Sequence, residues 1–137
     1  MNIAATCALA SLLVLPFLTG CQTTAPIRTV TAADSGGSVQ ISMGDLLEVH
    51  LEGNPTTGYT WMTGTINSWV LAPVGRPHFT PAGEGTNSPA MVGASGLFSL
   101  RYQPVGRGTS PLKLNYLRTW ETNLTPAKTF EITVTVR

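Results

Sequence analysis

Few residues in this chain of 137 could catalyse a reaction. Its histidines are His50 and His78, its cysteines are Cys7 and Cys21, and its Asp and Glu residues number only 7. His50 alternates with apolar neighbours and His78 follows a proline, so we expect both at the surface, neither as a metal ligand nor as a general base. No glycine-rich phosphate-binding loop opens a helical pattern. The sequence therefore predicts no enzymatic activity, no cofactor and no metal site.

The composition also narrows the class of partner. Charged residues make up 11% of the chain, and the formal net charge is +1. Charge-driven binding to nucleic acid or to acidic lipid needs a strongly basic surface, which this composition does not supply. Recognition of another protein remains, and we expect the domain to act as a monomer.

A first candidate binding segment has the residue types of a stiff, pointed turn. It consists of Asn54, Pro55, Thr56, Thr57, Gly58 and Tyr59, with Trp61 close behind. Proline fixes φ, threonine is restricted at χ1, asparagine can bond to its own backbone, and glycine permits a positive φ. Such a loop loses little conformational entropy when it docks on a partner. The same residues would also suit an ordinary β-turn that serves only the fold.

A second candidate segment is made of small residues. Gly93, Ala94, Ser95 and Gly96 stand immediately before an alternating, strand-like stretch. Two glycines flanking two small residues let the backbone approach another surface closely and pair with an extended chain. This segment alone is a weak signal.

A third candidate segment follows another alternating stretch and contains Arg118, Thr119 and Trp120. Arginine and tryptophan at a loop tip are residue types that dominate the energetics of protein interfaces. The alternative is a tryptophan that folds back onto the core, which is common.

Alternation of apolar with other residues predicts the strands that must position these segments. Four rows stand out: Leu47, Val49 and Leu51; Phe98, Leu100 and Tyr102; Leu112, Leu114 and Tyr116; and Phe130, Ile132, Val134 and Val136. No stretch has helical periodicity, and glycine and proline mark turns between the rows. This spacing indicates an all-β, immunoglobulin-like β-sandwich of about seven or eight strands.

The N-terminal segment indicates export. Residues 3–18 carry no charge, and their apolar run leads into Leu18-Thr19-Gly20-Cys21, which resembles the bacterial lipobox. The run is too short and too interrupted by proline for a membrane span. We expect residues 1–20 to be a lipoprotein signal peptide and Cys21 to be lipidated. The alternative is an ordinary cleaved signal with Cys21 as a free thiol.

Beyond the lipobox the chain divides in two. Residues 21–37 are rich in Thr, Ala, Ser and Gly and predict a flexible tether, so that the globular domain spans residues 38–137. Gln22, where an Asp would favour the inner membrane, resembles outer-membrane lipoproteins of Gram-negative bacteria. We therefore expect an exported protein whose membrane partner is reached through the lipid on Cys21.

The order of the motifs resembles the chagasin family of inhibitors of papain-like cysteine peptidases, from about Val39 to Arg137. The matching motifs are NPTTGY followed by Trp, a V-G-x-x-G loop, the pattern L-x-L-x-Y-x-R-x-W-E and a final F-x-I-x-V-x-V strand. In that family three loops form a wedge at one end of an immunoglobulin-like sandwich. The resemblance implies that Thr56 sits over the catalytic Cys, that the Gly93–Gly96 loop borders the non-primed side, and that Trp120 covers the primed side.

Two positions depart from the family pattern. Ser95 stands where the family usually has the first glycine of a pair, and Thr119 replaces the usual proline. An alternative therefore stays open: a non-inhibitory surface lipoprotein that keeps the sandwich for adhesion or envelope interaction. An assay against papain separates the two.

Overall fold

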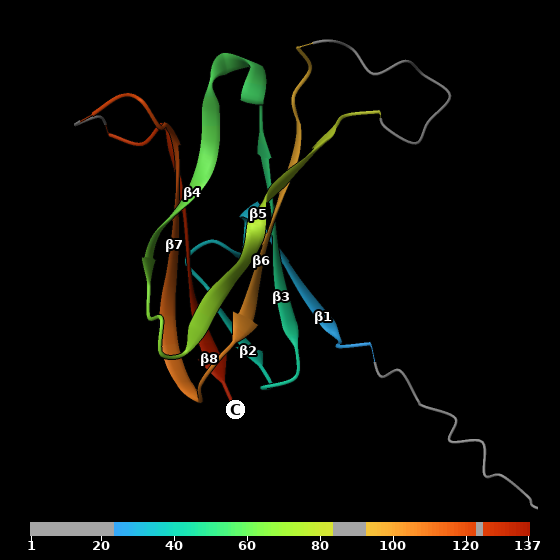
Figure 1. Ribbon diagram of the computed structural model, residues 1–137, viewed down its shortest axis with the longest axis vertical. Coiled ribbons are helices and arrows are strands. Elements are labelled where there is room, and N and C mark those ends of the chain that lie inside the picture. Colours follow the sequence, from blue (N-terminus) through green and yellow to red (C-terminus); the bar gives the residue numbers. More distant parts are fainter. Residues whose placement is uncertain (1–23, 84–92, 123–124) are drawn as a thin grey trace, which may run out of the picture.

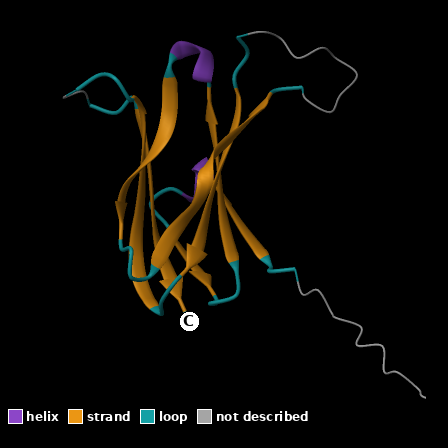
Figure 2. Ribbon diagram, viewed as in Figure 1, coloured by secondary structure: helices purple, strands orange, loops and turns teal. Residues whose placement is uncertain are grey.

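The strands form two four-stranded sheets (Figure 1, Figure 2). The computed structural model describes residues 24–83, 93–122 and 125–137. In spatial order the first sheet contains β1 (Ile27–Thr31), β3 (Leu46–Gly53), β6 (Gly96–Pro104) and β5 (Leu71–Pro81). The second sheet contains β2 (Ser38–Ile41), β8 (Lys128–Val136), β7 (Gly108–Arg118) and β4 (Tyr59–Ile66). This two-sheet sandwich confirms the fold class predicted from alternation.

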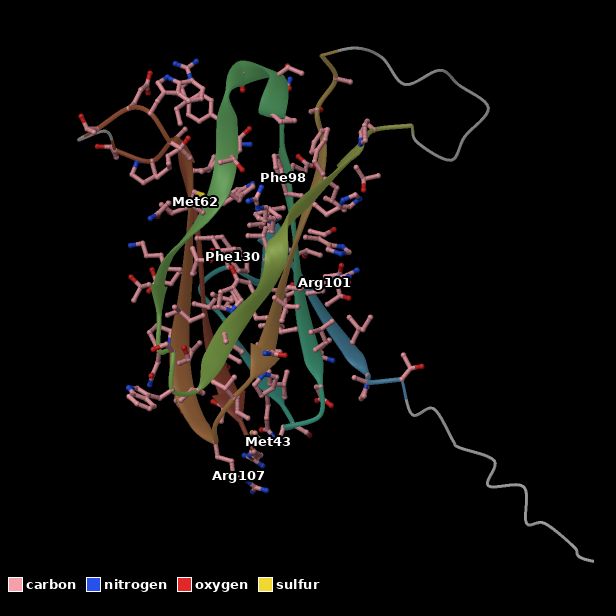
Figure 3. The ribbon with its side chains drawn as sticks, viewed as in Figure 1. Met43, Met62, Phe98, Arg101, Arg107 and Phe130 are labelled. Atoms are coloured by element: carbon pink, nitrogen blue, oxygen red, sulfur yellow. The ribbon has the colours of Figure 1, made fainter. Side chains whose placement is uncertain are left out.

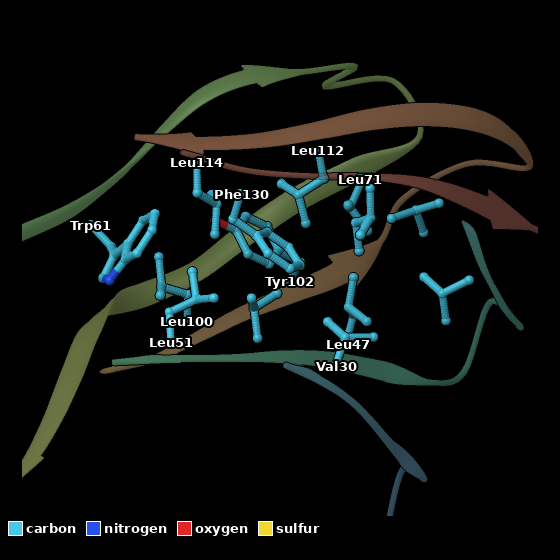
Figure 4. Packing of buried hydrophobic residues seen from close by; sticks show 14 of the residues in the cluster. Val30, Leu47, Leu51, Trp61, Leu71, Leu100, Tyr102, Leu112, Leu114 and Phe130 are labelled. Carbon is cyan, nitrogen blue, oxygen red and sulfur yellow. The ribbon is translucent and has the colours of Figure 1, made fainter. Parts of the chain in front are cut away.

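The core lies between the two sheets and is built from the alternating rows. Every member of the four predicted rows is buried, and residues of both sheets, among them Tyr102 of β6 and Phe130 of β8, meet between the layers (Figure 4). Burying one such large apolar side chain stabilises the fold by about 1.5–3 kcal/mol. The predicted strands therefore hold together through the faces that the sequence pattern indicated.

A contact between two hydroxyl groups crosses from sheet to sheet inside this core. The hydroxyl groups of Tyr102 on β6 and Thr63 on β4 lie 2.8 Å apart. Burial raises the pKa of the Tyr102 hydroxyl, and its hydrogen bond with Thr63 opposes that rise. The phenol therefore stays neutral and bonded, as a buried polar group must.

Antiparallel pairing brings three connections to one end of the sandwich. The ends of β3, β5 and β7 and the starts of β4, β6 and β8 all lie toward the top of Figure 1. The registers agree, because Gly96 at the start of β6 pairs with Gly53 at the end of β3 and with Pro81 at the end of β5. Tyr59 at the start of β4 pairs with Arg118 at the end of β7. All three candidate segments thus adjoin the same end.

The N-terminal part of the domain differs from the prediction. We predicted a flexible tether over residues 21–37, but β1 pairs in parallel with β3, and the 3-10 turn η1 (Ala32–Asp34) follows it. Val30 packs into the core with 4% exposure. The tether prediction is therefore wrong for residues 27–34, and the domain begins before Ser38. Alternation could not reveal β1, because Val30 is its one buried residue.

Strand β5 was also not predicted from the sequence. His78, which we expected at the surface, is exposed, but it lies within β5, a strand that the alternating rows did not predict. Of the 11 residues of this strand only Leu71 is buried, and the register with β6 shifts between Val74 and His78. A bulged edge strand of this kind lacks the period of two on which the prediction rests.

The predicted signal peptide (residues 1–20) and the predicted lipidation site Cys21 lie outside the described residues. Within the described ranges, no helix has the length and apolar character that crossing a bilayer requires.

Removing β1 should destabilise the domain measurably. A chain that begins at Ser38 loses the burial of Val30, which contributes about 1.5–3 kcal/mol, and leaves β3 as an unpaired edge. We expect its free energy of unfolding to be lower by at least about 2 kcal/mol than that of a chain that begins at Thr24. Urea unfolding followed by circular dichroism measures this, with the exposed Thr29→Ala change as a near-neutral control. Equal unfolding free energies would contradict the structural role of β1.

Candidate functional site

The candidate site lies at the end of the sandwich that is at the top of Figure 1. We call it the loop edge and define it as Asn54–Tyr59, Gly93–Gly96 and Arg118–Trp120. All the site residues predicted from the sequence, apart from Cys21, lie in the described part of the chain. Two hydrogen bonds between segments distant in sequence, from Asn54 to Gly93 and from Arg118 to Thr57, show that the structure brings the three segments together.

The first segment of the loop edge is a capped turn. Residues Pro55–Thr57 form the 3-10 turn η2, and the Oδ1 atom of Asn54 accepts hydrogen bonds from the Thr56 backbone N–H (3.0 Å) and the Thr56 hydroxyl (2.6 Å). The Thr57 hydroxyl donates to the Asn54 carbonyl at 2.6 Å. Gly58 closes the turn with φ at 81°, a left-handed conformation that favours glycine. The residue types thus act as the sequence analysis expected.

Below this turn lies a stack of aromatic rings. The hydroxyl of Tyr116 on β7 accepts a hydrogen bond from the Asn54 N–H at 2.7 Å and donates to the Asn54 carbonyl at 3.3 Å. The Tyr116 ring is stacked on Tyr59, with ring centroids 5.2 Å apart, and lies 5.1 Å from Trp61. The first segment is therefore fixed to the body of the sandwich. Tyr116 belongs to one of the predicted buried rows, but no local sequence pattern indicates this role of its hydroxyl.

The first and second segments are joined directly. The side-chain amide of Asn54 donates a hydrogen bond to the Gly93 carbonyl at 2.9 Å. Gly93 has φ at 84°, again the left-handed conformation. The contact joins residues 39 positions apart in the chain, and no local sequence pattern could have indicated it.

The remainder of the second segment runs close to β5. A Cβ atom at Gly96 would collide with the Thr80 carbonyl, so only glycine fits there. The Ser95 carbonyl accepts a hydrogen bond from the Ala82 N–H at 3.2 Å, and Ser95 itself is exposed. The small residues thus allow a close approach between two strands of the protein itself, and Ser95 faces solvent where the family pattern has glycine.

Arg118 joins the first and third segments. Its Nε atom donates to the Thr57 carbonyl at 3.1 Å, and its guanidinium carbon lies 4.6 Å from the centre of the Tyr59 ring. Its Nη1 atom also pairs with the Glu121 carboxylate at 3.1 Å. A guanidinium with all these partners is already oriented, so Arg118 holds the turn in place whether or not it touches a partner protein.

Trp120 is displayed at the end of the third segment. Its exposed fraction is 66%, whereas that of Trp61 is 3%, so Trp120 is not folded into the core. A Cβ atom at Gly58 would lie only 2.7 Å from Cζ2 of Trp120, which places the indole against the turn. Glycine at position 58 therefore makes room for the ring as well as permitting the turn. Thr119 beside it is exposed.

The chemistry available at the loop edge is limited to contact. In the residues that the structure describes, no group of His, Cys, Asp and Glu could hold a metal ion. Pro55, Thr56 and Thr57 are exposed at the tip of the turn, and both threonine hydroxyls already donate to Asn54. The loop edge thus presents a firm projecting surface with an indole beside it.

Comparisons with known proteins agree with this geometry. The family model described as "Chagasin family peptidase inhibitor I42" matches residues 40–134. Amoebiasin-2 of Entamoeba histolytica is 30% identical over 119 residues, covering 84% of this chain and 89% of amoebiasin-2. Chagasin of Trypanosoma cruzi is 30% identical over 95 residues, covering 66% of this chain and 81% of chagasin.

The likeness extends to three dimensions. The crystal structure of a cysteine protease inhibitor from Entamoeba histolytica superposes with a TM-score of 0.69 at 26% identity, covering 82% of this chain and 96% of that one. The matched family and this superposition span both sheets, because residues 40–134 run from β2 into β8. The chain therefore belongs to the chagasin family of peptidase inhibitors, which is a family of inhibitors and not of enzymes.

Proposed function

We propose that this domain inhibits papain-like cysteine peptidases by inserting the loop edge into the active-site cleft. Thr56 then sits above the catalytic Cys, the Gly93–Gly96 segment borders the non-primed side, and Trp120 covers the primed side. Membership of the family supports the class of target. The observation that carries the proposal is the pair of hydrogen bonds that join the three segments, from Asn54 to Gly93 and from Arg118 to Thr57.

A loop edge whose three segments are already joined by hydrogen bonds loses little conformational entropy on binding. Ordering a mobile side chain at an interface costs about 0.5–1.5 kcal/mol, and ordering the backbone of a residue costs about 1–2 kcal/mol. Asn54, Thr57 and Arg118 have their hydrogen bonds before any partner arrives. Folding has therefore already ordered most of these groups. Contact area at the exposed turn and at Trp120 then contributes to affinity with little further loss of conformational entropy.

Inhibition by this route is steric and not chemical. The peptide bond between Thr56 and Thr57 lies within η2, where the Thr57 N–H points back to the Asn54 carbonyl at 3.4 Å and the Gly58 N–H to the Pro55 carbonyl at 2.9 Å. A tightly turned backbone does not present its carbonyl in the extended form that a papain-like cleft cuts. The turn therefore fills the space above the nucleophile without offering it a substrate.

The steric proposal is tested with papain and with papain whose catalytic Cys is replaced by Ala. We expect competitive inhibition of active papain, binding of comparable strength to the inactive form, and recovery of the intact domain from the complex, because no step needs the thiolate. Cleavage at Thr56-Thr57 at the rate of an ordinary substrate, or loss of binding to inactive papain, would refute the steric mechanism. A folded domain that leaves papain fully active would favour the non-inhibitory surface lipoprotein instead.

Trp120 should be an energetic anchor of the complex. Its ring is large, exposed and restricted by the turn beside it, so its removal costs contact area and little stability. We expect Trp120→Ala to raise the inhibition constant roughly thirtyfold, which corresponds to about 2 kcal/mol, with the thermal midpoint nearly unchanged. The matched control is Trp69→Ala, which removes a tryptophan 86% exposed at the opposite end and should leave inhibition unaltered. An equal rise in the inhibition constant for both variants would show that Trp120 is not in the interface.

A further inference from the structure

The end of the sandwich opposite the loop edge has features of its own. We call it the far end and define it by the connections 42–45, 67–70 and 105–107 together with Arg137. Figure 3 shows Met43 and Arg107 there, away from the three loops. These segments are tied to one another, because the Val70 carbonyl accepts hydrogen bonds from the N–H groups of Val105 (2.9 Å) and Gly106 (3.3 Å). The Arg137 N–H donates to the Ile41 carbonyl at 3.0 Å.

Exposed apolar side chains gather at the far end and at the start of the neighbouring β1. Among the described residues, seven large hydrophobic side chains are exposed, and four of them lie here: Trp69 (86%), Ile27 (52%), Val105 (44%) and Met43 (41%). Trp69 is more exposed than Trp120, which the proposed function already explains. Apolar groups grouped at an exposed surface mark an interaction site more often than single ones do.

The turn that carries Trp69 is rigid. The Trp69 N–H donates to Oδ1 of Asn67 at 3.1 Å, and the Asn67 N–H donates to the hydroxyl of the fully buried Ser110 at 2.9 Å. The Val70 N–H returns to the Asn67 carbonyl at 3.0 Å. The indole is thus held out into solvent by a turn anchored in the core, and its exposure is not the result of a loose loop.

The N-terminal part of the chain joins the domain at this same end. β1 runs parallel to β3, with Ile27 opposite Leu46, and the Leu46 N–H donates to the Pro26 carbonyl at 2.9 Å. Cys21 stands six residues before Ile27 in the sequence. Six residues reach at most about 20 Å, whereas the tether predicted over residues 21–37 could have reached roughly 60 Å. A lipid on Cys21 would therefore hold the far end close to the bilayer.

We propose that the far end is a membrane-facing surface, with the Trp69 indole in the headgroup region of a lipid bilayer and the loop edge directed away from it. An indole suits this region, because its ring is apolar and its N–H can bond to water or headgroups. The charged side chains of the far end are Arg107, Arg137 and Asp45, so its excess of positive charge is small and charge contributes little to contact with a bilayer. The short tether supplies the affinity, since it keeps the indole at a high effective concentration beside the bilayer.

This surface orients the inhibitor. The three loops and the far end lie at opposite ends of the strands (Figure 1), so a far end on the membrane leaves the loop edge accessible to a peptidase in the adjoining compartment. The proposal does not depend on the identity of the peptidase, nor on inhibition itself, because it rests on the far end and on the point at which the chain enters the domain.

The test uses the full-length chain, produced in a Gram-negative host and reconstituted into phosphatidylcholine vesicles with brominated acyl chains. The Trp120→Phe protein retains Trp69 as its exposed tryptophan and the Trp69→Phe protein retains Trp120, while the buried Trp61 is common to both. We expect the brominated lipid to quench the fluorescence of the Trp120→Phe protein severalfold more than that of the Trp69→Phe protein. High salt should not release this contact, because charge does not hold it.

Four results would overturn the proposal. Equal quenching of the two variants would show that the far end does not face the lipid. Failure of the full-length chain to associate with vesicles would show that no lipid anchor holds it there. Release of the chain by high salt would show that charge, and not apolar contact, holds the far end at the bilayer. A blue shift of Trp69 emission that grows with protein concentration in the absence of vesicles would assign the far end to a second copy of this chain. Papain inhibition by the Trp69→Phe protein, which should match that of the unaltered chain, separates failure of this proposal from failure of the proposed function.

Discussion

Asn54 forms hydrogen bonds that the rest of the loop edge depends on. Its side-chain oxygen caps the turn at Thr56, its side-chain amide reaches the Gly93 carbonyl, and its backbone is bound by the Tyr116 hydroxyl. One residue therefore ties a turn, a neighbouring loop and the core together. Because these contacts are short and use both ends of the side chain, movement of one segment would break bonds to the others. Only asparagine and glutamine carry a side-chain amide with both an acceptor oxygen and a donor nitrogen, and glutamine is longer by one methylene group.

The sandwich makes this arrangement possible. Antiparallel pairing delivers three connections to one end, and the aromatic stack of Tyr59, Tyr116 and Trp61 forms a firm floor under the turn. Arg118 then bridges from that floor to the Thr57 carbonyl and leaves Trp120 beside Gly58. The packed aromatic rings, the capped turn and the exposed indole are therefore linked by one continuous series of contacts. The opposite end carries the rigid Trp69 turn and the entry of the chain, which gives the domain two ends with different surfaces.

Sequence reasoning succeeded where residues act through local rules. The four alternating rows predicted strands because each has one buried face, and the turn at Asn54 was predictable from proline, glycine and a capping side chain. It failed for β1 and β5, which each bury a single residue and so carry no period. The bonds from Asn54 to Gly93 and to Tyr116 join residues 39 and 62 positions apart, and tertiary packing alone brings them together. The residue types of the three candidate segments could thus be read from the sequence, but the long-range contacts that hold the segments together could not.

The loop edge is ordered before any peptidase binds, and the most direct measurement of that order is the NMR backbone order parameter in the free domain. Residues 54–58 and 118–120 should have values near about 0.85, close to those of the β-strands on either side, because their hydrogen bonds are made in the unbound protein. Values below about 0.6 would mean that the segments move on the picosecond to nanosecond timescale and are ordered only by the partner. That result would contradict the claim that the fold prepares the loop edge for binding.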